Sequence, residues 1–397
     1  MHLATPMTDC SETVICFSHL RWRFVHQRPH HLLSRCARSR RVLYVEEPIA
    51  AAGAPGLEVE RVDGGVEVVV PRLPSSLRGL AAERTQAALI ERLVAETGTR
   101  SPIVWFYTPM ALDLARSLRP RTVVYDCMDE LSGFLGAPPE LAARERRLFE
   151  RADVVFTGGY SLYEHKRRHH RNIHPFPSSV DVDHFIEARG LRPEPADQEG
   201  LPRPRIGFFG VIDERMDLRL IEQIAEAEPL WQLVMIGPTA KIDPDHLPRR
   251  DNIHWLGPKP YGALPDYLAG WDVAILPFCR NEATRYISPT KTPEYLAAGK
   301  PVVSTSIRDV ASPYGEPGLA WIADEPLDFA AAIREALRSD RDARIAQADA
   351  FLADRSWDST WDAMWAHVEV AVRARARQAS IEVEGDGSPV LGALAEE

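Results

Sequence analysis

Lys291 and Glu294 are the two side chains of this sequence whose types and spacing most clearly suggest chemistry. They lie three residues apart in the segment 288–305, SPTKTPEYLAAGKPVVST, so in a helix they share one face. A helix that opens near Thr290 presents free N–H groups and a partial positive charge, which suit a diphosphate, and Lys291 adds a full charge. Glu294, one turn further on, could accept hydrogen bonds from both hydroxyls of a ribose. An ordinary exposed Lys–Glu pair would have the same spacing.

The apolar run that follows this helix, at 302–304, helps to place the pair. It has the length and composition of a buried strand. In open α/β sheets, ligands bind outside the carboxyl ends of the strands. We therefore predict that the start of the helix lies at the ligand-binding edge of a sheet.

Strands alternate with helices along almost the whole chain, which predicts parallel, doubly wound sheets. The predicted strands are 13–20, 42–45, 103–107, 122–125, 154–157, 206–209, 233–236, 253–255, 273–276, 302–304 and 319–322. The predicted helices are 29–37, 81–96, 111–118, 141–150, 162–169, 217–226, 261–269, 290–298, 327–338 and 341–376, the last with a break near Ser356. The stretch 57–71, which contains Gly64 and Gly65, predicts a hairpin at a sheet edge.

The length of the chain, 397 residues, exceeds one ordinary core and predicts two domains. We expect an α/β protein whose two Rossmann-like domains, at 1–188 and 205–355, face a cleft. A polar, proline-rich stretch at 189–204 predicts the linker. A helix at 356–377 is expected to cross back, and the acidic tail at 378–397 is predicted to be disordered.

The composition is that of a soluble globular enzyme, with 45% hydrophobic and 26% charged residues. No apolar run has the length of a membrane span, and the first residues lack the pattern of a secretory signal, so we expect a cytoplasmic protein. The five cysteines are scattered without any Cys-x-x-Cys pair, which predicts reduced thiols rather than disulfides or a zinc site.

The formal charge of −10 is unevenly distributed. Residues 1–190 carry 25 Lys and Arg against 23 Asp and Glu, so the excess of acid lies in the second half. This balance argues against bulk nucleic-acid binding. Basic residues concentrate at 35–41 and at 165–171 (HKRRHHR), where they could meet an anionic acceptor or the inner membrane surface. A solvated helix face is an equally good explanation for both runs.

Several common catalytic signatures are absent from the sequence. It contains no Gly-x-Gly-x-x-Gly after a strand, no P-loop and no Gly-x-Ser-x-Gly, which disfavours a dehydrogenase, an NTPase and an α/β hydrolase. The histidines at 26, 30 and 31 lack acidic partners at ligand spacing, so we interpret them as surface or loop residues. Two Asp-x-Asp sequences, at 181–183 and 243–245, are too short to predict a metal site.

The segment 287–305 resembles the donor site of the retaining glycosyltransferases of the GT-B fold, family 4 or group 1 type. The segments 152–161, 176–185, 252–257 and 264–278 agree with this resemblance, which covers nearly all of residues 13–365. It places Asp181 and Asp183 in the crossover between the domains rather than in a metal site.

The resemblance also implies roles for individual residues on the donor side. Lys291 would meet the donor phosphates and Glu294 the nucleotide ribose, with Ser288 and Thr290 in the same donor-binding segment. The sequence 210–215, GVIDER, follows the first strand of the second domain, where such enzymes carry a glycine-rich turn and a basic residue. Gly210 is therefore expected to bind the donor. Arg215 and Lys291 are expected to act in catalysis; the alternative for Arg215 is a solvent-exposed side chain after a turn.

One position departs from the family pattern. The family usually has a second glutamate eight residues before the ribose-binding one, and here that position is Tyr286. Two substitutes for sugar recognition remain open. Either Glu282 acts from a shifted loop, or the backbone N–H groups around Ile287 and Ser288 bind the sugar.

The first domain is expected to hold the acceptor. Trp22, Gln27 and Arg28 lie in the loop between its first strand and first helix, in a segment (18–32) that resembles a subset of bacterial cell-surface polysaccharide glycosyltransferases. Asp126 and Asp129 follow the predicted strand at 122–125 and could orient an acceptor hydroxyl, or could instead cap helices.

The sequence thus predicts a glycosyltransferase, of hexosyltransferase type, that acts without a metal or other cofactor. It would move a sugar from a nucleotide-sugar donor to a glycan or lipid-linked acceptor with retention of configuration, in the synthesis of cell-surface polysaccharide. Arg215, Lys291 and the helix N–H groups would stabilise the departing diphosphate. Two alternatives remain: an enzyme resembling the nucleotide-sugar 2-epimerases, and a non-catalytic module that binds a nucleotide sugar or a glycan.

Overall fold

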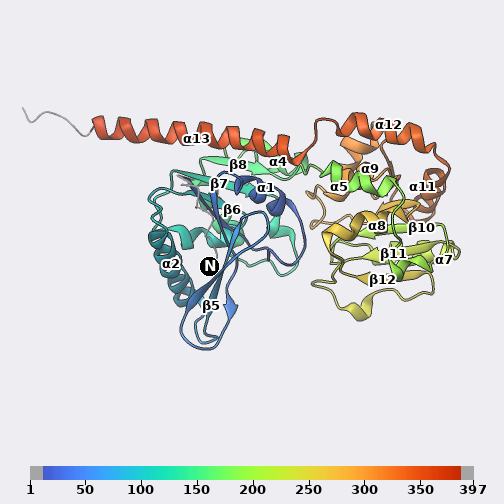
Figure 1. Cartoon of the computed structure of the whole chain (residues 1–397), viewed down its shortest axis with the longest axis horizontal. Coiled ribbons are helices and arrows are strands. Elements are labelled where there is room, and N and C mark those ends of the chain that lie inside the picture. Colours follow the sequence, from blue (N-terminus) through green and yellow to red (C-terminus); the bar gives the residue numbers. More distant parts are fainter. Residues whose placement is uncertain (1–11, 386–397) are drawn as a thin grey trace, which may run out of the picture.

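The computed structural model describes residues 12–385, which form two α/β domains side by side (Figure 1). In the described chain, the first domain contains a nine-stranded sheet with the order β3-β5-β2-β1-β6-β7-β8-β9, and β4 pairs with β5 outside this path. Its strands are β1 (Thr13–Phe17), β2 (Arg41–Val45), β3 (Ile49–Ala50), β4 (Gly56–Arg61), β5 (Glu67–Leu73), β6 (Ile103–Phe106), β7 (Thr122–Cys127), β8 (Val154–Thr157) and β9 (Ile173–Pro175). All pairs are parallel except β4 with β5, the predicted hairpin.

The helices of the first domain follow its strands as the alternation predicts. They are α1 (Arg28–Cys36), α2 (Gly79–Glu96), α3 (Leu141–Arg151) and α4 (Tyr160–Lys166). The helix predicted at 111–118 is instead a 3-10 helix, Pro109–Ala115, which Thr108 starts by accepting a hydrogen bond from the N–H of Met110. A fully buried strand such as β1 has helices on both faces of its sheet, which explains its continuous apolar run.

The second domain is built around a six-stranded parallel sheet with the order β12-β11-β10-β13-β14-β15. Its strands are β10 (Arg205–Phe209), β11 (Gln232–Ile236), β12 (Ile253–Gly257), β13 (Val273–Leu276), β14 (Val302–Ser304) and β15 (Ala320–Ile322). Its helices are α7 (Leu218–Ala227), α8 (Leu264–Ala269), α9 (Lys291–Ala297), α10 (Arg308–Val310), α11 (Pro326–Arg338) and α12 (Arg341–Leu352). The predicted fold class, two doubly wound domains facing a cleft, is confirmed.

The chain crosses from the first domain to the second earlier than the linker predicted at 189–204. Val180, Phe185 and Ala188 already belong to the core of the second domain, with the short helix α5 (Val182–Ile186) among them. The linker stretch also packs on this domain, because it contains α6 (Ala196–Glu199), in which Gln198 is fully buried and accepts a hydrogen bond from Trp271. These buried residues stand among polar neighbours in the sequence, so the sequence pattern does not reveal them. Their contacts place the boundary between the two domains before residue 189.

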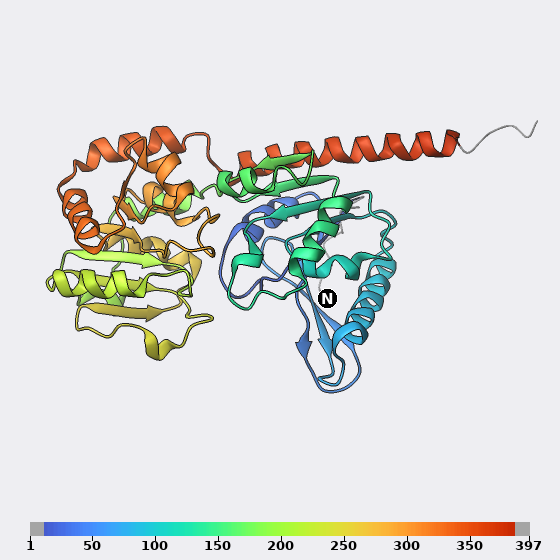
Figure 2. The same cartoon turned by 180° about the vertical axis from the view of Figure 1, so that it is seen from behind.

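The C-terminal helix α13 (Trp357–Gly385) returns to the first domain and lies along it (Figures 1 and 2). Its buried side chains join the first-domain core: Trp357, Trp361, Met364, Trp365, Val368, Ala371 and Val372. The two crossings lie next to each other, since Val180 donates a backbone hydrogen bond to Arg355. The helix continues to Gly385, so disorder does not begin at 378 as predicted; the rest of the predicted tail lies outside the described residues.

Candidate active site

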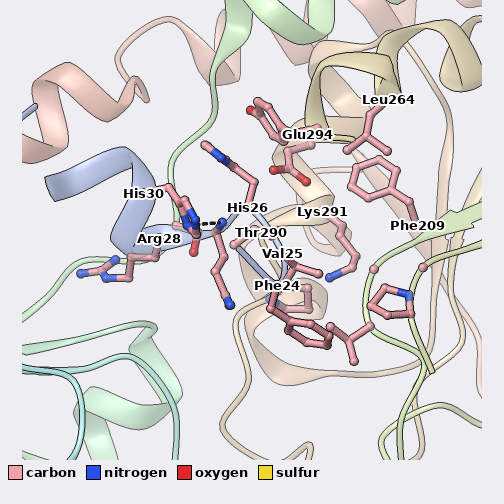
Figure 3. Close-up of a pocket in the computed structure, with 18 of the residues that line it drawn as sticks. Phe24, Val25, His26, Arg28, His30, Phe209, Leu264, Thr290, Lys291 and Glu294 are labelled. Atoms are coloured by element: carbon pink, nitrogen blue, oxygen red, sulfur yellow. Dashed lines mark hydrogen bonds between the residues drawn. The ribbon is translucent and has the colours of Figure 1, made fainter. Parts of the chain in front are cut away.

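A cavity of about 490 Å³ separates the two domains, and both of them line it. The first domain contributes the loop 22–28 and Asp129, and the second contributes residues that follow its strands and the start of α9. Figure 3 shows Lys291 and Glu294 facing Phe24, Val25 and His26 across this space. The cavity lies where parallel strands end, which is where open α/β sheets bind ligands.

Helix α9 places Lys291 and Glu294 on the cavity wall, with Ser288 and Thr290 just before them. The buried hydroxyl of Tyr295 accepts a hydrogen bond from the N–H of Phe209 at 3.0 Å, which fixes the helix to the end of β10. Glu294 is only 7% exposed. Burial raises its pKa above the usual range and Asp181 adds to this effect, while Lys291 opposes it.

Two glycines make room for the lysine. Gly210 follows β10 with a φ of +143°, and the Cε of Lys291 lies 2.0 Å from where a Cβ on Gly210 would be. Gly237 follows β11 with a φ of +147°, and a Cβ there would lie 1.7 Å from the carbonyl oxygen of Gly210. Side chains at these positions would displace Lys291 or the turn beneath it. Gly210 therefore contributes to the site through its backbone. Gly237 has a related role that the sequence analysis did not predict.

Arg215 lines the cavity but is not a free cation. Its guanidinium binds the buried carboxylate of Asp213 through Nε and Nη2, at 2.6 Å for the closest contact. On the opposite domain, the ring centroid of Phe134 lies 5.2 Å from its Cζ. Asp213 and Phe134 thus hold Arg215 at the cavity, and neither residue was expected from the sequence. Asp213 lies only two residues before Arg215, but the conformation of the turn is needed to show that the two side chains form an ion pair.

Asp129 is the acidic residue of the first domain that reaches the same space. Burial raises its pKa to about 6, Arg215 and Lys291 lower it, Asp213 raises it and Arg28 lowers it. The structure therefore brings together the predicted donor side and one predicted acceptor-side residue.

Arg28 and Asp126 form a buried ion pair rather than an open acceptor site. Asp126 is a residue of β7 with no exposed surface, and its carboxylate oxygens lie 3.1 and 3.2 Å from the Nε of Arg28. The guanidinium also donates to the carbonyl of Phe176 at 2.8 Å, and in Figure 3 it points away from Lys291. The prediction that Asp126 orients an acceptor hydroxyl is therefore corrected, because both of its oxygens face Arg28. Arg28 touches the cavity but holds the loop in place.

Trp22 and Gln27 both line the cavity, as predicted. The backbone N–H of Trp22 donates to Glu46 at 2.8 Å, and its indole ring packs edge-on against Tyr44. Gln27 precedes α1, and its N–H donates to Nδ1 of His30 at 3.2 Å. These contacts order the loop that faces the second domain.

Neither Tyr286 nor Glu282 lines the cavity. Tyr286 reaches the first domain, where its ring stacks on His165 with centroids 4.5 Å apart. The side chain of Glu282 is 77% exposed and pairs with Arg285. The N–H of Ile287 donates to the carbonyl of Thr284. The shifted-loop alternative for Glu282 is therefore not supported, and of the predicted backbone donors the one at Ile287 is already used.

An aromatic contact across the cleft was also missed. His26 stacks on Tyr261 with centroids 4.1 Å apart and an interplanar angle of 26°. Tyr261 follows β12, so its place at a strand end was the signal that could have revealed it. His30 and His31 are buried in α1 and His31 stacks on Trp357, which corrects their interpretation as surface residues.

The Asp-x-Asp sequences do not assemble a metal site. Asp243 and Asp245 lie in an exposed turn, where the carboxylate of Asp243 accepts the N–H of Asp245. Within residues 12–385, no group of three or more His, Cys, Asp and Glu side chains is arranged to hold a metal ion.

Comparison with known proteins indicates the class of protein that this chain resembles. Residues 203–339 match the family model described as "Glycosyl transferases group 1". A Bacillus subtilis (strain 168) protein, provisionally named as the teichuronic acid biosynthesis glycosyltransferase TuaH, is 27% identical over 274 residues, which cover 64% of this chain and 68% of that protein.

Solved structures show the same architecture. Sucrose-phosphate synthase (tll1590) from Thermosynechococcus elongatus superposes with a TM-score of 0.68 at 13% identity, over 91% of this chain and all of that chain. A UDP-forming α,α-trehalose-phosphate synthase from Burkholderia xenovorans superposes with a TM-score of 0.66 at 13% identity, over 90% and 98%. The two domains facing a cleft therefore have the GT-B fold, and the comparisons together support a glycosyltransferase.

Proposed function

We propose that this protein transfers a sugar from a nucleoside diphosphate sugar to a glycan or lipid-linked acceptor, with retention of configuration. The observation that carries the proposal is the convergence of Lys291 and Arg215 on one cavity, beside the glycine turn at 210 and the buried Glu294. Two cations and a close backbone approach match a diphosphate, and a buried carboxylate matches ribose hydroxyls.

The reaction needs stabilisation of the negative charge that builds on the departing diphosphate. Lys291 and Arg215 would supply positive charge from the cavity wall, where each is held in place before the charge on the diphosphate develops. Before the donor binds, Asp213 and Asp129 balance these cations. We therefore propose that the cation requirement is met by side chains, that no metal cofactor takes part, and that the donor phosphate accepts the acceptor proton.

Asp129 is our candidate for orienting the acceptor hydroxyl. It comes from the opposite domain and lies close enough to Arg215 and Lys291 for both to lower its pKa. The relative named for teichuronic acid biosynthesis favours a cell-surface polysaccharide as the product.

The decisive experiment offers UDP-, GDP- and dTDP-sugars to the protein with and without polysaccharide and lipid-linked acceptors. Acceptor-dependent release of the nucleoside diphosphate is expected, in the presence of EDTA, and the anomeric configuration of the product can be read by NMR. Sugar isomerisation or nucleotide release without any acceptor would favour an epimerase. Donor binding without turnover against every acceptor would favour a binding module.

A further inference from the structure

The two basic runs of the first domain have different fates in the fold. The run at 35–41 is neutralised internally, because each of its four arginines lies beside a carboxylate. Arg35 and Arg38 bind Asp358, Arg40 binds Glu12, and Arg41 binds Glu67. These arginines form ion pairs with carboxylates of α13, of β5 and of the residue before β1, so they are not available to a partner.

The run at 165–171 instead leaves cations on the surface. Lys166 is buried at the end of α4, where its Nζ lies 2.6 Å from Glu130 and 2.7 Å from Glu145. It is therefore not accessible to a partner at the surface. The exposed members, Arg167, Arg168, His169 and Arg171, are called here the basic surface. Arg167 pairs with Glu164, but within residues 12–385 Arg168 and Arg171 have no carboxylate partner.

The surroundings of the basic surface favour a broad anionic partner. Its four residues border an open groove of about 870 Å³ together with Phe149, Tyr163 and Ile173, and Glu150 is the one acid among the lining residues of this part of the described chain. The next residue, Arg151, has its pKa lowered by burial and then by the nearby charge of Arg375. Like charges are therefore crowded here, in a chain whose formal net charge is −10.

Helix α4 links this surface to the active site. Its first residue, Tyr160, is 53% exposed, and it directly follows the pair Gly158–Gly159, of which Gly158 lines the cavity. Seven helical residues span about 10 Å, and the chain after them returns to the start of β8, where His170 contacts the carbonyl of Ala152 at 3.0 Å. The basic surface therefore lies by the amino ends of β8 and β9, whereas the cavity lies by the carboxyl end of β8. Tyr163 borders the groove together with the arginines, and a tyrosine beside arginine is a combination suited to the interface between headgroups and water.

We propose that the basic surface docks the protein peripherally on a bilayer that contains anionic lipids. The groove is open, and none of its cations is buried and aimed inward, so it lacks the enclosure that a discrete soluble anion would need. Acidic surfaces elsewhere on the chain are repelled by the same lipids, so attraction at this face also orients the molecule. This docking is independent of the proposed transfer reaction.

Sedimentation with vesicles tests the proposal without donor or acceptor. The full-length protein is mixed with vesicles of phosphatidylcholine alone, or with one third phosphatidylglycerol. Binding is expected only to the anionic vesicles, and it should weaken as salt is added. The variant R167Q/R168Q/R171Q should lose about fivefold in partition per arginine, on the order of a hundredfold in all.

A matched control removes three other exposed arginines from the same domain. Arg78, Arg84 and Arg100 have no ion pair among the described residues and flank or lie on α2, so R78Q/R84Q/R100Q makes the same change in net charge. This control should bind anionic vesicles like the parent protein. Equal losses in both variants, or equal binding to neutral vesicles, would overturn the proposal. Binding of a soluble polyphosphate without binding of anionic vesicles would overturn it in favour of a soluble anionic ligand.

Discussion

Glu294 is a single residue whose burial at the site lowers the stability of the folded protein. Its carboxyl is buried beside Asp181, and its pKa is raised, so the folded chain favours the neutral form. The stability of the fold should therefore fall as the pH rises above the ordinary pKa of a glutamate. A ligand that donates hydrogen bonds to the carboxylate would offset this cost.

The substitution Glu294→Gln should separate the two effects. Donor affinity is expected to fall by about 1.5–3 kcal/mol, because a charged hydrogen bond is lost. The melting temperature of the free protein should stay level or rise at neutral pH, since glutamine is neutral without having to take up a proton when the chain folds. Calorimetric titration with the donor and melting curves across pH measure both. Unchanged donor affinity would show that Glu294 does not bind the ribose.

Arg215 and Lys291 should act together on the leaving diphosphate. Each substitution by alanine is expected to raise the activation barrier of sugar transfer by about a few kcal/mol. This is the size of the effect of removing one hydrogen-bond donor from an oxyanion hole. The double variant should lose less than the sum, because the first loss already misplaces the phosphates. Turnover of a labelled nucleotide sugar measures this. Normal kinetics for Arg215→Ala would indicate that its pairing with Asp213 is purely structural.

The raised pKa of Asp129 leads us to expect that turnover depends on pH. With a pKa of about 6, the carboxyl is ionised above that pH and protonated below it. If the carboxylate orients the acceptor, turnover should fall as the pH drops through about 6. In Asp129→Asn this acid limb should vanish with most of the turnover, while binding of the nucleoside diphosphate should persist or tighten, because a negative charge beside Arg215 and Lys291 is removed. An unaltered pH profile in Asp129→Asn would contradict the assignment.

At the scale of elements, the turn after β10 decides where Lys291 can lie. In Gly210→Ala, a methyl group would occupy the position now taken by Cε of Lys291, and a φ of +143° is unfavourable for alanine. We expect the KM for the donor to rise at least tenfold. Gly53→Ala is the matched control, because Gly53 also has a positive φ, +91°, but nothing lies within 4 Å of its missing Cβ. Similar donor kinetics in both variants would argue against this role of Gly210.

At the scale of the whole molecule, α13 follows the second domain in the chain and packs on the first domain. Among the described side chains of α13, the last apolar one in the first-domain core is Val372, and Arg375 pairs with Asp153 just beyond it. Deletion of the residues after Gln378 should therefore change the melting temperature little. Deletion from Trp357 onward removes three packed tryptophans, each worth about 3–5 kcal/mol if truncated to alanine, and should unfold the first domain. Thermal unfolding of both truncated chains compares them. A large loss in the shorter deletion would mean that the last residues also dock on the body.

The sequence by itself determined the fold class and most of the donor side of the site. Buried strands appear as apolar runs, and residues that follow such strands meet at one sheet edge whatever the details of packing. This is why Lys291 and Glu294 could be expected at the ligand-binding edge of the sheet from the strand pattern. Gly210, Ser288 and Thr290 were expected at the donor site from the resemblance to glycosyltransferases, and all of these residues line the cavity. Local spacing was also sufficient for the hairpin at β4 and β5.

The tertiary structure alone decided which polar groups remain available to a ligand. Asp126 and Asp129 are three residues apart, yet one is consumed by Arg28 and the other reaches the cavity. The runs at 35–41 and 165–171 are similarly basic, but the first is neutralised by α13 and strand carboxylates, some of them more than three hundred residues away. The charge of a side chain is local, whereas its partner comes from wherever the fold places an opposite charge, and no spacing rule contains that information.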